Sequence, residues 1–320
     1  MVTMTATDIN FVEVFMRIFV TGASGWVGSA VVPELIGAGH EVVGLARSDV
    51  SAAALTEAGA DVHRGSLDDL DGLRAAAAAS DGVIHLAFKH DIAFSGDFDG
   101  AVAADRAAIE AFGEALAGSD RPFVIAAGTL GLTSGRVATE QDGRTGQAAI
   151  GGGPAGRMDN ARLVLSLADR GVRSVVLRLP PTVHGDGDNG FVPTQITIAR
   201  DNGVSGYIGE GANRWPAVHR SDAARLFRLA VEQAPAGSVL HAIDDEGVPV
   251  RKIAEVIGRH LDLPAVSIAP ENAGAHFGWL AGFLGADSPA SSAATRESTG
   301  WRPTQPRLIE DLDKGHYFQG

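Results

Sequence analysis

Cysteine is absent from the 320-residue sequence, which excludes a disulfide framework and thiolate chemistry. Basic residues are outnumbered, 26 against 39 acidic ones, and the formal net charge of −13 argues against a nucleic-acid partner, which needs a basic face. No apolar run approaches the roughly 18 residues that span a membrane. Residues 1–15 contain no lysine or arginine, so they lack the basic start of a signal peptide. These absences favour a cytoplasmic protein that acts on a small molecule, with no nucleic-acid or membrane partner.

The most informative segment, residues 17–28, reads Arg-Ile-Phe-Val-Thr-Gly-Ala-Ser-Gly-Trp-Val-Gly. It predicts a buried strand, a glycine turn and a helix that continues to residue 36, which together form the first unit of a dinucleotide-binding fold. Gly22 permits the tight turn, Gly25 lets a pyrophosphate approach the backbone, and Gly28 lets the helix pack closely on the strand. The free N–H groups at the helix start favour phosphates. The alternative is an ordinary strand-to-helix turn.

The spacing Gly-x-x-Gly-x-x-Gly resembles the extended branch of the short-chain dehydrogenase/reductase superfamily, the NAD(P)-dependent epimerase/dehydratase-like proteins. Further segments resemble the same family: Asp-x-Val-x-His-x-Ala at 81–87, Val-His-x-x-Asp at 218–222 and Trp-x-Pro at 301–303. Within these segments we expect His85 to be a structural, hydrogen-bonded histidine. Asp222 is expected to cap or orient a helix rather than to perform chemistry.

The resemblance implies an α/β fold, a Rossmann-type doubly wound parallel sheet with a smaller C-terminal substrate lobe. Residues 1–15 are expected to be an extension, native or artificial, with no role in the fold. We expect a dinucleotide-binding domain at 16–185 and a substrate lobe at 186–320, from which about 219–243 return to the first domain. The lobe should cover a cleft over the nicotinamide, and a homodimer is compatible with this organisation.

The end of the second predicted strand, residues 41–46, indicates which cofactor binds. An acidic residue there would bind the ribose 2′-OH of NAD. This chain has Arg47 and Ser48, and a guanidinium with a hydroxyl suits the 2′-phosphate of NADP(H). A solvated surface arginine is the alternative, and Asp49 follows one position later.

The cofactor-binding residues implied by the glycine turn and by the resemblance lie at the ends of successive strands. Ser66 stands where the family usually has aspartate, so only the two residues after it are carried over from that stretch. Residues 180–184 resemble the segment that packs against the nicotinamide. The complete set is Thr21, Gly22, Ser24, Gly25, Trp26, Val27, Gly28, Arg47, Ser48, Leu67, Asp68, Leu86, Ala87, Thr129, Pro180, Thr182 and Val183.

Tyrosine and lysine are scarce in a way that bears on catalysis. Most members of the superfamily use Tyr-x-x-x-Lys to move a proton and bind the ribose, and the pair should lie near residues 150–160. The two tyrosines are Tyr207 and Tyr317, and the lysines are Lys89, Lys252 and Lys314, so the pair is absent. Without it, a strongly basic alkoxide is hard to form. We therefore expect pre-activated electrophiles, such as iminium cations or conjugated alkenes, to react better than simple ketones.

Three residues are candidates for the catalytic roles. Arg157 stands near the expected lysine and can bind a ribose or phosphate, although it cannot relay protons. Thr129 matches the family's substrate-binding Ser or Thr, with a turn-forming threonine as the alternative. His184 is the best substitute acid among His184, Asp159, Asp186 and Tyr207, because its ordinary pKa is near neutrality; a hydrogen-bonded loop histidine is the alternative. The sequence contains no His-x-x-x-His pair, so it does not predict a metal site.

Three functions follow from these residues. The favoured one is an NADPH-dependent reductase of a small carbonyl, imine or activated alkene, because the glycine turn and Arg47 predict the cofactor. The second is a nucleotide-binding sensor that retains the cofactor site without catalysis, and the third is a cofactor-retaining epimerase or dehydratase.

Overall fold

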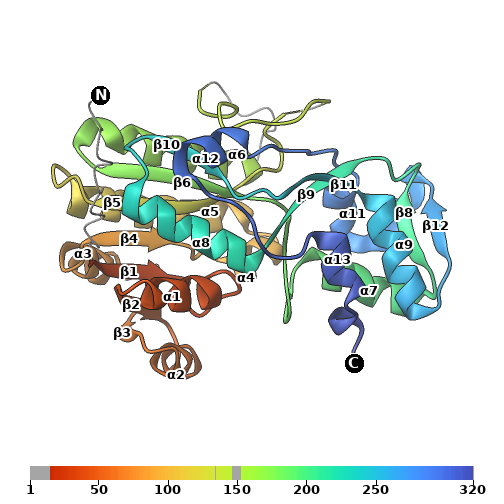
Figure 1. The fold of residues 1–320 in the computed structure, drawn as a ribbon, viewed down its shortest axis with the longest axis horizontal. Coiled ribbons are helices and arrows are strands. Elements are labelled where there is room, and N and C mark those ends of the chain that lie inside the picture. The colour runs from red at the N-terminus through yellow and green to blue at the C-terminus, as the bar shows by residue number, and fades with distance from the viewer. Residues whose placement is uncertain (1–14, 134, 146–152, 320) are drawn as a thin grey trace, which may run out of the picture.

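The computed structural model describes residues 15–133, 135–145 and 153–319, which form a large α/β lobe and a smaller lobe beside it (Figure 1). The predicted N-terminal extension lies outside the described residues, apart from Phe15. Residues 133–156 are rich in Gly, Ser, Thr and Gln, which predicts a long loop, and residue 134 and residues 146–152 of it also lie outside the described residues. No helix within the described ranges is long and apolar enough to cross a membrane.

The large lobe is built on a sheet of seven parallel strands in the order β10-β6-β5-β4-β1-β2-β3. The chain builds one side outward from β1 and then crosses over to build the other, which confirms the predicted doubly wound Rossmann-type fold. The strands are β1 (Arg17–Thr21), β2 (Glu41–Ala46), β3 (Asp61–Arg64), β4 (Gly82–His85), β5 (Pro122–Gly128), β6 (Arg173–Leu179) and β10 (Ser238–His241).

Helices cover both faces of this sheet, which explains why its central strands are apolar on both sides. Helices α1 and α8 pack on one face, and α3, α5 and α6 pack on the other (Figure 1). The helices of this lobe are α1 (Gly28–Gly37), α2 (Asp49–Glu57), α3 (Leu70–Ala78), α4 (His90–Phe94), α5 (Phe98–Leu116), α6 (Gly153–Ser166), α8 (Arg220–Gln233) and α12 (Ala293–Thr299).

The smaller lobe contains a three-stranded sheet in the order β11-β9-β7 and a parallel pair of β8 and β12. These strands are β7 (Thr182–His184), β8 (Ser205–Ile208), β9 (Arg214–His219), β11 (Asp245–Pro249) and β12 (Ala265–Ile268). Its helices are α7 (Phe191–Asn202), α9 (Val250–Leu261), α10 (Ala273–Phe277), α11 (Ala281–Leu284) and α13 (Leu308–Asp313). The sequence did not predict β7, β8, β9, β11, α10, α11 or α13, because elements of three to six residues show too little periodicity.

Two helices begin earlier than their sequence patterns predict. The Ala-rich run at 51–59 predicts a helix, and α2 begins at Asp49, because the Ser48 hydroxyl caps it by accepting the backbone N–H of Ser51 at 3.2 Å. The sequence predicts a further helix at 158–170, and α6 begins at Gly153 and is followed by a 3-10 turn, Leu167–Arg170. A proline at position 154 is compatible with this early start, because the backbone N–H groups in the first turn of a helix have no acceptor within the helix.

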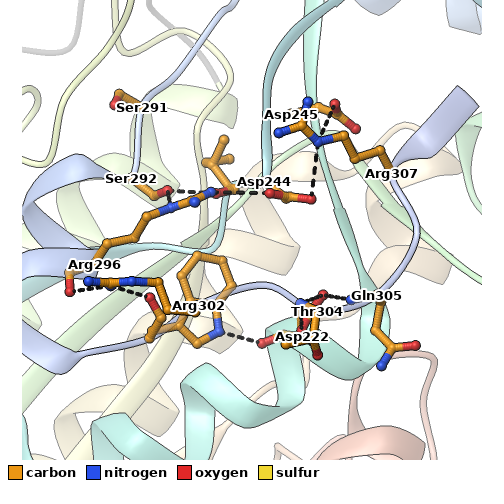
Figure 2. A network of polar contacts seen from close by, with 12 residues as sticks. Asp222, Asp244, Asp245, Ser291, Ser292, Arg296, Arg302, Thr304, Gln305 and Arg307 are labelled. Carbon is orange, nitrogen blue, oxygen red and sulfur yellow. Dashed lines mark hydrogen bonds and ion pairs between the residues drawn. The ribbon is translucent and has the colours of Figure 1, made fainter.

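The C-terminal segment runs back from α12 along the large lobe and is fastened by Asp222 (Figure 2). The Asp222 carboxylate accepts the backbone N–H groups of Thr304 at 3.0 Å and Gln305 at 2.9 Å, and its carbonyl accepts the indole N–H of Trp301 at 2.9 Å. Asp222 does not cap α8, since His219 is the N-cap residue of that helix. Its carboxylate instead orients α8 against the returning segment.

Candidate active site

A cleft of about 830 Å³ runs along the carboxyl ends of the strands in the large sheet and continues to the start of α7. This is the edge at which open parallel sheets bind ligands. The volume lies within the range of about 300–1,000 Å³ that is usual for small-molecule sites. The cleft is therefore the candidate active site.

The glycine turn forms the centre of the cleft wall. Gly22 has φ +66°, and a Cβ there would lie 2.7 Å from the backbone nitrogen of Ala87, just after the neighbouring strand β4, so both backbone geometry and packing require glycine. A Cβ at Gly25 would meet only the Gly22 carbonyl oxygen, at 3.1 Å. No side chain caps the start of α1, and Gly25 and Gly28 both line the cleft there. This cradle fits a pyrophosphate, which would occupy the space that a side chain at Gly25 would fill.

Charged residues surround one end of the cleft, beyond β2 and β3. Arg47 lies 3.2 Å from the Asp91 carboxylate, and both side chains are exposed. Lys89 binds the Asp68 carboxylate at 2.6 Å. All four residues line the cleft, so two ion pairs connect the segment after β4 to the ends of β2 and β3.

A buried polar network ties the end of β1 to the end of β4 and to α5. His85 is contacted at both ring nitrogens, with Nδ1 2.6 Å from the Thr21 hydroxyl and Nε2 3.1 Å from the Asp105 carboxylate. Asn160 donates to the second oxygen of Asp105 at 2.8 Å. Burial works to raise the pKa of Asp105, but His85, Arg157 and Asn160 hold it below its ordinary value. Thr21 and His85 therefore fix the floor beneath the glycine turn.

Arg157, in the first turns of α6, lies on the cleft wall. Its guanidinium lies 4.2 Å above the centre of the Phe88 ring and donates to the Ala126 carbonyl at 3.3 Å. Burial lowers the pKa of Arg157, and the Asp105 carboxylate opposes that shift. The ring of His90 lies 5.1 Å from that of Phe88, and burial together with the Arg157 charge lowers the pKa of His90. The start of α6 thus presents a fixed positive charge beside a titratable histidine.

Segment 179–191 lines another part of the cleft, mostly with apolar side chains. Trp26 reaches across from the glycine turn and donates its indole N–H to the Val183 carbonyl at 2.8 Å. The following loop is fastened by Tyr317, whose hydroxyl donates to Asp188 at 3.0 Å and accepts the Gly185 N–H at 3.0 Å. Phe191 continues this wall into the smaller lobe.

His184 faces away from the cleft. Its side chain is 1% exposed, and Nδ1 lies 2.9 Å from the Asp311 carboxylate of α13. Thr129 is also buried, at 2% exposure, next to Gly128 of the cleft wall. Among the described residues, the Thr129 hydroxyl and His184 Nε2 have no hydrogen-bond partner. Of the three predicted catalytic residues, the structure therefore brings only Arg157 to the cleft wall.

Most of the predicted cofactor residues line the cleft: Gly22, Ser24, Gly25, Trp26, Val27, Gly28, Arg47, Leu67, Asp68, Leu86, Ala87, Pro180 and Val183. Thr21, Ser48, Thr129 and Thr182 do not, because Thr21 binds His85, Ser48 caps α2, and the other two are buried. Sequence reasoning missed Phe88, Lys89, His90 and Asp91, which follow β4, and Asn189, Gly190 and Phe191, which precede or begin α7. The run of aromatic and charged residues directly after a buried strand was an available signal for the first group.

A second hollow of about 560 Å³ lies where α12 and the C-terminal segment meet β11 (Figure 2). Its arginines contact its aspartates: Arg296 binds Asp244 at 3.2 Å, and Arg307 lies 3.8 Å from Asp244 and 3.9 Å from Asp245. Because these arginines and aspartates pair with one another, we interpret the polar lining of this hollow as a structural network. Within the described residues, no group of His, Asp or Glu side chains has the arrangement of a metal site.

Comparison with known proteins identifies relatives across the chain. Residues 18–112 match the NAD dependent epimerase/dehydratase family. The chain is 47% identical to the uncharacterized protein C2A9.02 of Schizosaccharomyces pombe over 304 residues, which cover 95% of this chain and 100% of that protein. It is 27% identical over 244 residues, 74% of each chain, to the decarboxylating sterol-4-alpha-carboxylate 3-dehydrogenase of Dictyostelium discoideum.

A solved structure shares the fold. The dTDP-glucose 4,6-dehydratase DesIV of Streptomyces venezuelae, determined with NAD bound, has a TM-score of 0.73 at 18% identity, and the match covers 94% of this chain and 96% of that one.

Proposed function

Because this chain belongs to the NAD-dependent epimerase/dehydratase family, the extended branch of the short-chain dehydrogenases/reductases, we propose that it is an NADPH-dependent oxidoreductase that reduces a small organic substrate. The family consists of NAD(P)-dependent oxidoreductases and epimerases. The observation that carries the finer proposal is Arg47 on the cleft wall, at the strand end where the family chooses between NAD and NADP.

The surroundings of Arg47 support the proposal that it binds the 2′-phosphate of NADPH. Asp49, the acidic residue that would argue for NAD, does not line the cleft and is bound by Arg64 at 2.7 Å. Lys89 adds a second positive charge to the same end of the cleft. A phosphate at Arg47 would replace the Asp91 carboxylate with a more highly charged anion, and the guanidinium can bind it through paired hydrogen bonds.

The other cofactor contacts follow from the cleft wall. Gly25 and the start of α1 would hold the pyrophosphate, and Arg157 would bind the hydroxyls of the nicotinamide ribose in place of the missing lysine. NADPH supplies a hydride when bound. The protein residues then have to position the acceptor and manage the charge that develops on it.

The site has to stabilise the charge that develops on the hydride acceptor without a tyrosine, because neither Tyr207 nor Tyr317 lines the cleft. Arg157 cannot give up its proton, but its charge can stabilise an oxygen that becomes negative. His90 is the histidine on the cleft wall, and its lowered pKa leaves the imidazole largely neutral at pH 7. These residues favour a substrate that needs no strong acid during hydride transfer.

The absence of Tyr-x-x-x-Lys also supports a second candidate, a sensor that binds NADPH without catalysis. The two functions differ in turnover. A panel of carbonyls, imines and activated alkenes, with NADPH consumption as the readout, separates them, since a sensor binds the cofactor and consumes none.

The cofactor proposal is tested with Arg47→Ala. One charge-assisted contact contributes about 1.5–3 kcal/mol, so the Kd for NADPH should rise about tenfold or more and the Kd for NADH should remain unchanged. Arg106→Ala is the matched control, because Arg106 is another exposed arginine in an ion pair, with Glu110 on α5. Equal losses for both cofactors in Arg47→Ala, or tighter binding of NADH than NADPH by the parent, would overturn the assignment.

A further inference from the structure

The acidic side chain that pairs with Arg47 comes from a distant part of the chain. Arg47 directly follows β2, and its guanidinium lies 3.2 Å from the carboxylate of Asp91, 44 positions later in α4. Both side chains line the cleft, and they are 72% and 57% exposed. Asp49, which is nearer to the strand end, lies outside the lining of the cleft and binds Arg64. The acid that faces Arg47 is therefore Asp91.

The Arg47–Asp91 pair occupies the guanidinium that a 2′-phosphate would bind. Within the residues that the structure describes, Arg47 forms no ion pair with any other carboxylate. The hydrogen bond from Arg47 holds the pKa of Asp91 below its ordinary value, so the carboxylate is ionised at neutral pH. A phosphate that takes a paired, charge-assisted contact with Arg47 has to break this ion pair first. The same step is not required of a cofactor without the phosphate.

The segment that carries Asp91 is anchored independently of it. The ammonium group of Lys89 lies 2.6 and 2.8 Å from the two carboxylate oxygens of Asp68, which connects the segment after β4 to the end of β3. Asp91 also accepts the backbone N–H of Ile92 at 3.1 Å, a bond that the amide oxygen of an asparagine can keep. A neutral residue of the same size at position 91 should therefore free Arg47 and leave the segment in place.

We propose that Asp91 is a specificity-determining residue, which competes with the 2′-phosphate for Arg47 and so limits the preference for NADPH over NADH. This inference rests on the proposed function, in particular on the contact between Arg47 and the 2′-phosphate. NADH carries a hydroxyl in place of that phosphate, so it does not compete with Asp91 for the guanidinium.

The test is Asp91→Asn, with the Kd for NADPH and for NADH measured by calorimetry at low ionic strength, where exposed charges are screened least. The Kd for NADPH should fall about threefold to fivefold, the range that one exposed ion pair allows, and the Kd for NADH should change less than about twofold. Adenosine 2′,5′-bisphosphate and 5′-AMP repeat the comparison with two fragments that differ only in the 2′-phosphate.

Two further variants separate competition at Arg47 from the general effect of removing a negative charge. Asp49→Asn makes the same change of charge close to the strand end but removes no contact of Arg47, so it should change the Kd for NADPH less than about twofold. In the double variant Arg47→Ala/Asp91→Asn, the asparagine should give less than about a twofold gain over Arg47→Ala alone, because no ion pair remains to be broken.

An unchanged Kd for NADPH in Asp91→Asn would overturn the inference, and so would equal gains for NADPH and NADH. The same gain from Asp49→Asn, or an undiminished gain in the Arg47→Ala background, would overturn it as well, because the effect would then not pass through Arg47. If Arg47→Ala itself leaves the Kd for NADPH unchanged, the cofactor assignment fails and the inference fails with it. If Arg47→Ala weakens NADPH binding and Asp91→Asn has no effect, only the inference fails.

Discussion

Replacing Gly25 with valine should abolish most cofactor binding and leave the fold intact. A Cβ at this position meets only the Gly22 carbonyl oxygen, at 3.1 Å, so the backbone needs little adjustment. The two methyl groups would extend into the cleft at the uncapped start of α1. They would displace a phosphate from N–H groups whose charge-assisted hydrogen bonds contribute about 1.5–3 kcal/mol each.

The loss of one such bond, about 2 kcal/mol, corresponds to a rise of about thirtyfold in Kd. Calorimetry with NADPH measures this directly, and thermal unfolding followed by circular dichroism reports the fold. Gly28→Ala is the contrasting variant. Its Cβ would overlap the Gly22 carbonyl oxygen and lie 2.7 Å from the backbone of Ala23, so it should lower the Tm strongly, whereas Gly25→Val should change the Tm by only a few degrees.

The reasoning about the phosphate position is refuted if Gly25→Val binds NADPH as tightly as the parent does. In that case the phosphates do not lie at the start of α1. If Gly25→Val and Gly28→Ala lose the same amount of stability, a side chain at Gly25 does not have the space that the structure gives it. Gly25→Ala then separates displacement of the phosphate from strain in the fold, because a single methyl group still occupies the phosphate position and strains the backbone less than valine does.

Two further predictions concern buried polar groups. Burial and the nearby Arg178 lower the pKa of His241 from 6.5 to about 4, so its contribution to stability is present above pH 6.5 and is lost as the pH falls toward 4. Urea titrations should show a loss of the order of 2 kcal/mol between pH 7 and pH 5 that His241→Gln removes, because glutamine can still accept from Arg178 and donate to the Ser291 carbonyl; the same pH dependence in both proteins would contradict this. Tyr317→Phe removes the side-chain donor of the half-buried Asp188 carboxylate, which keeps only the Gly190 N–H, and should lower the free energy of unfolding by about 1 kcal/mol and raise the KM for an enone, with the Kd for NADPH unchanged. An unchanged KM would show that this loop does not shape the substrate wall.

The parts of the fold and site that were predictable from sequence are local in the chain. The strand, glycine turn and helix of residues 17–28 form one contiguous unit, and the close packing of Gly22 and Gly28 follows from their spacing within it. Arg47 was predictable for the same reason, since it follows directly from the end of β2. The doubly wound sheet followed from the family resemblance and from the alternation of strands and helices.

The parts that were not predictable depend on partners far away in sequence. His184 looked available as an acid, but Asp311, 127 positions later, binds its ring nitrogen. Ser48 looked like a phosphate ligand, but a serine before a helix also caps it, and the sequence does not decide between the two uses. Phe191 gave no signal at all, because its place at the end of the cleft results from the packing of the smaller lobe.

The position of Arg157 decides between the two kinds of activated substrate that the missing tyrosine left open. An iminium cation would bring a second positive charge toward a guanidinium, and Asp105 offsets the Arg157 charge only in part, because it is also bound to His85 and Asn160. A conjugated enone is neutral when it binds. Hydride adds to its β-carbon, the electron pair moves to the carbonyl oxygen, and the resulting enolate is a much weaker base than the alkoxide from a simple ketone. Arg157 would stabilise that negative oxygen, and the proton that completes the reduction can come later from water. The charges on the cleft wall therefore favour the enone, the substrate for which the lost tyrosine matters least.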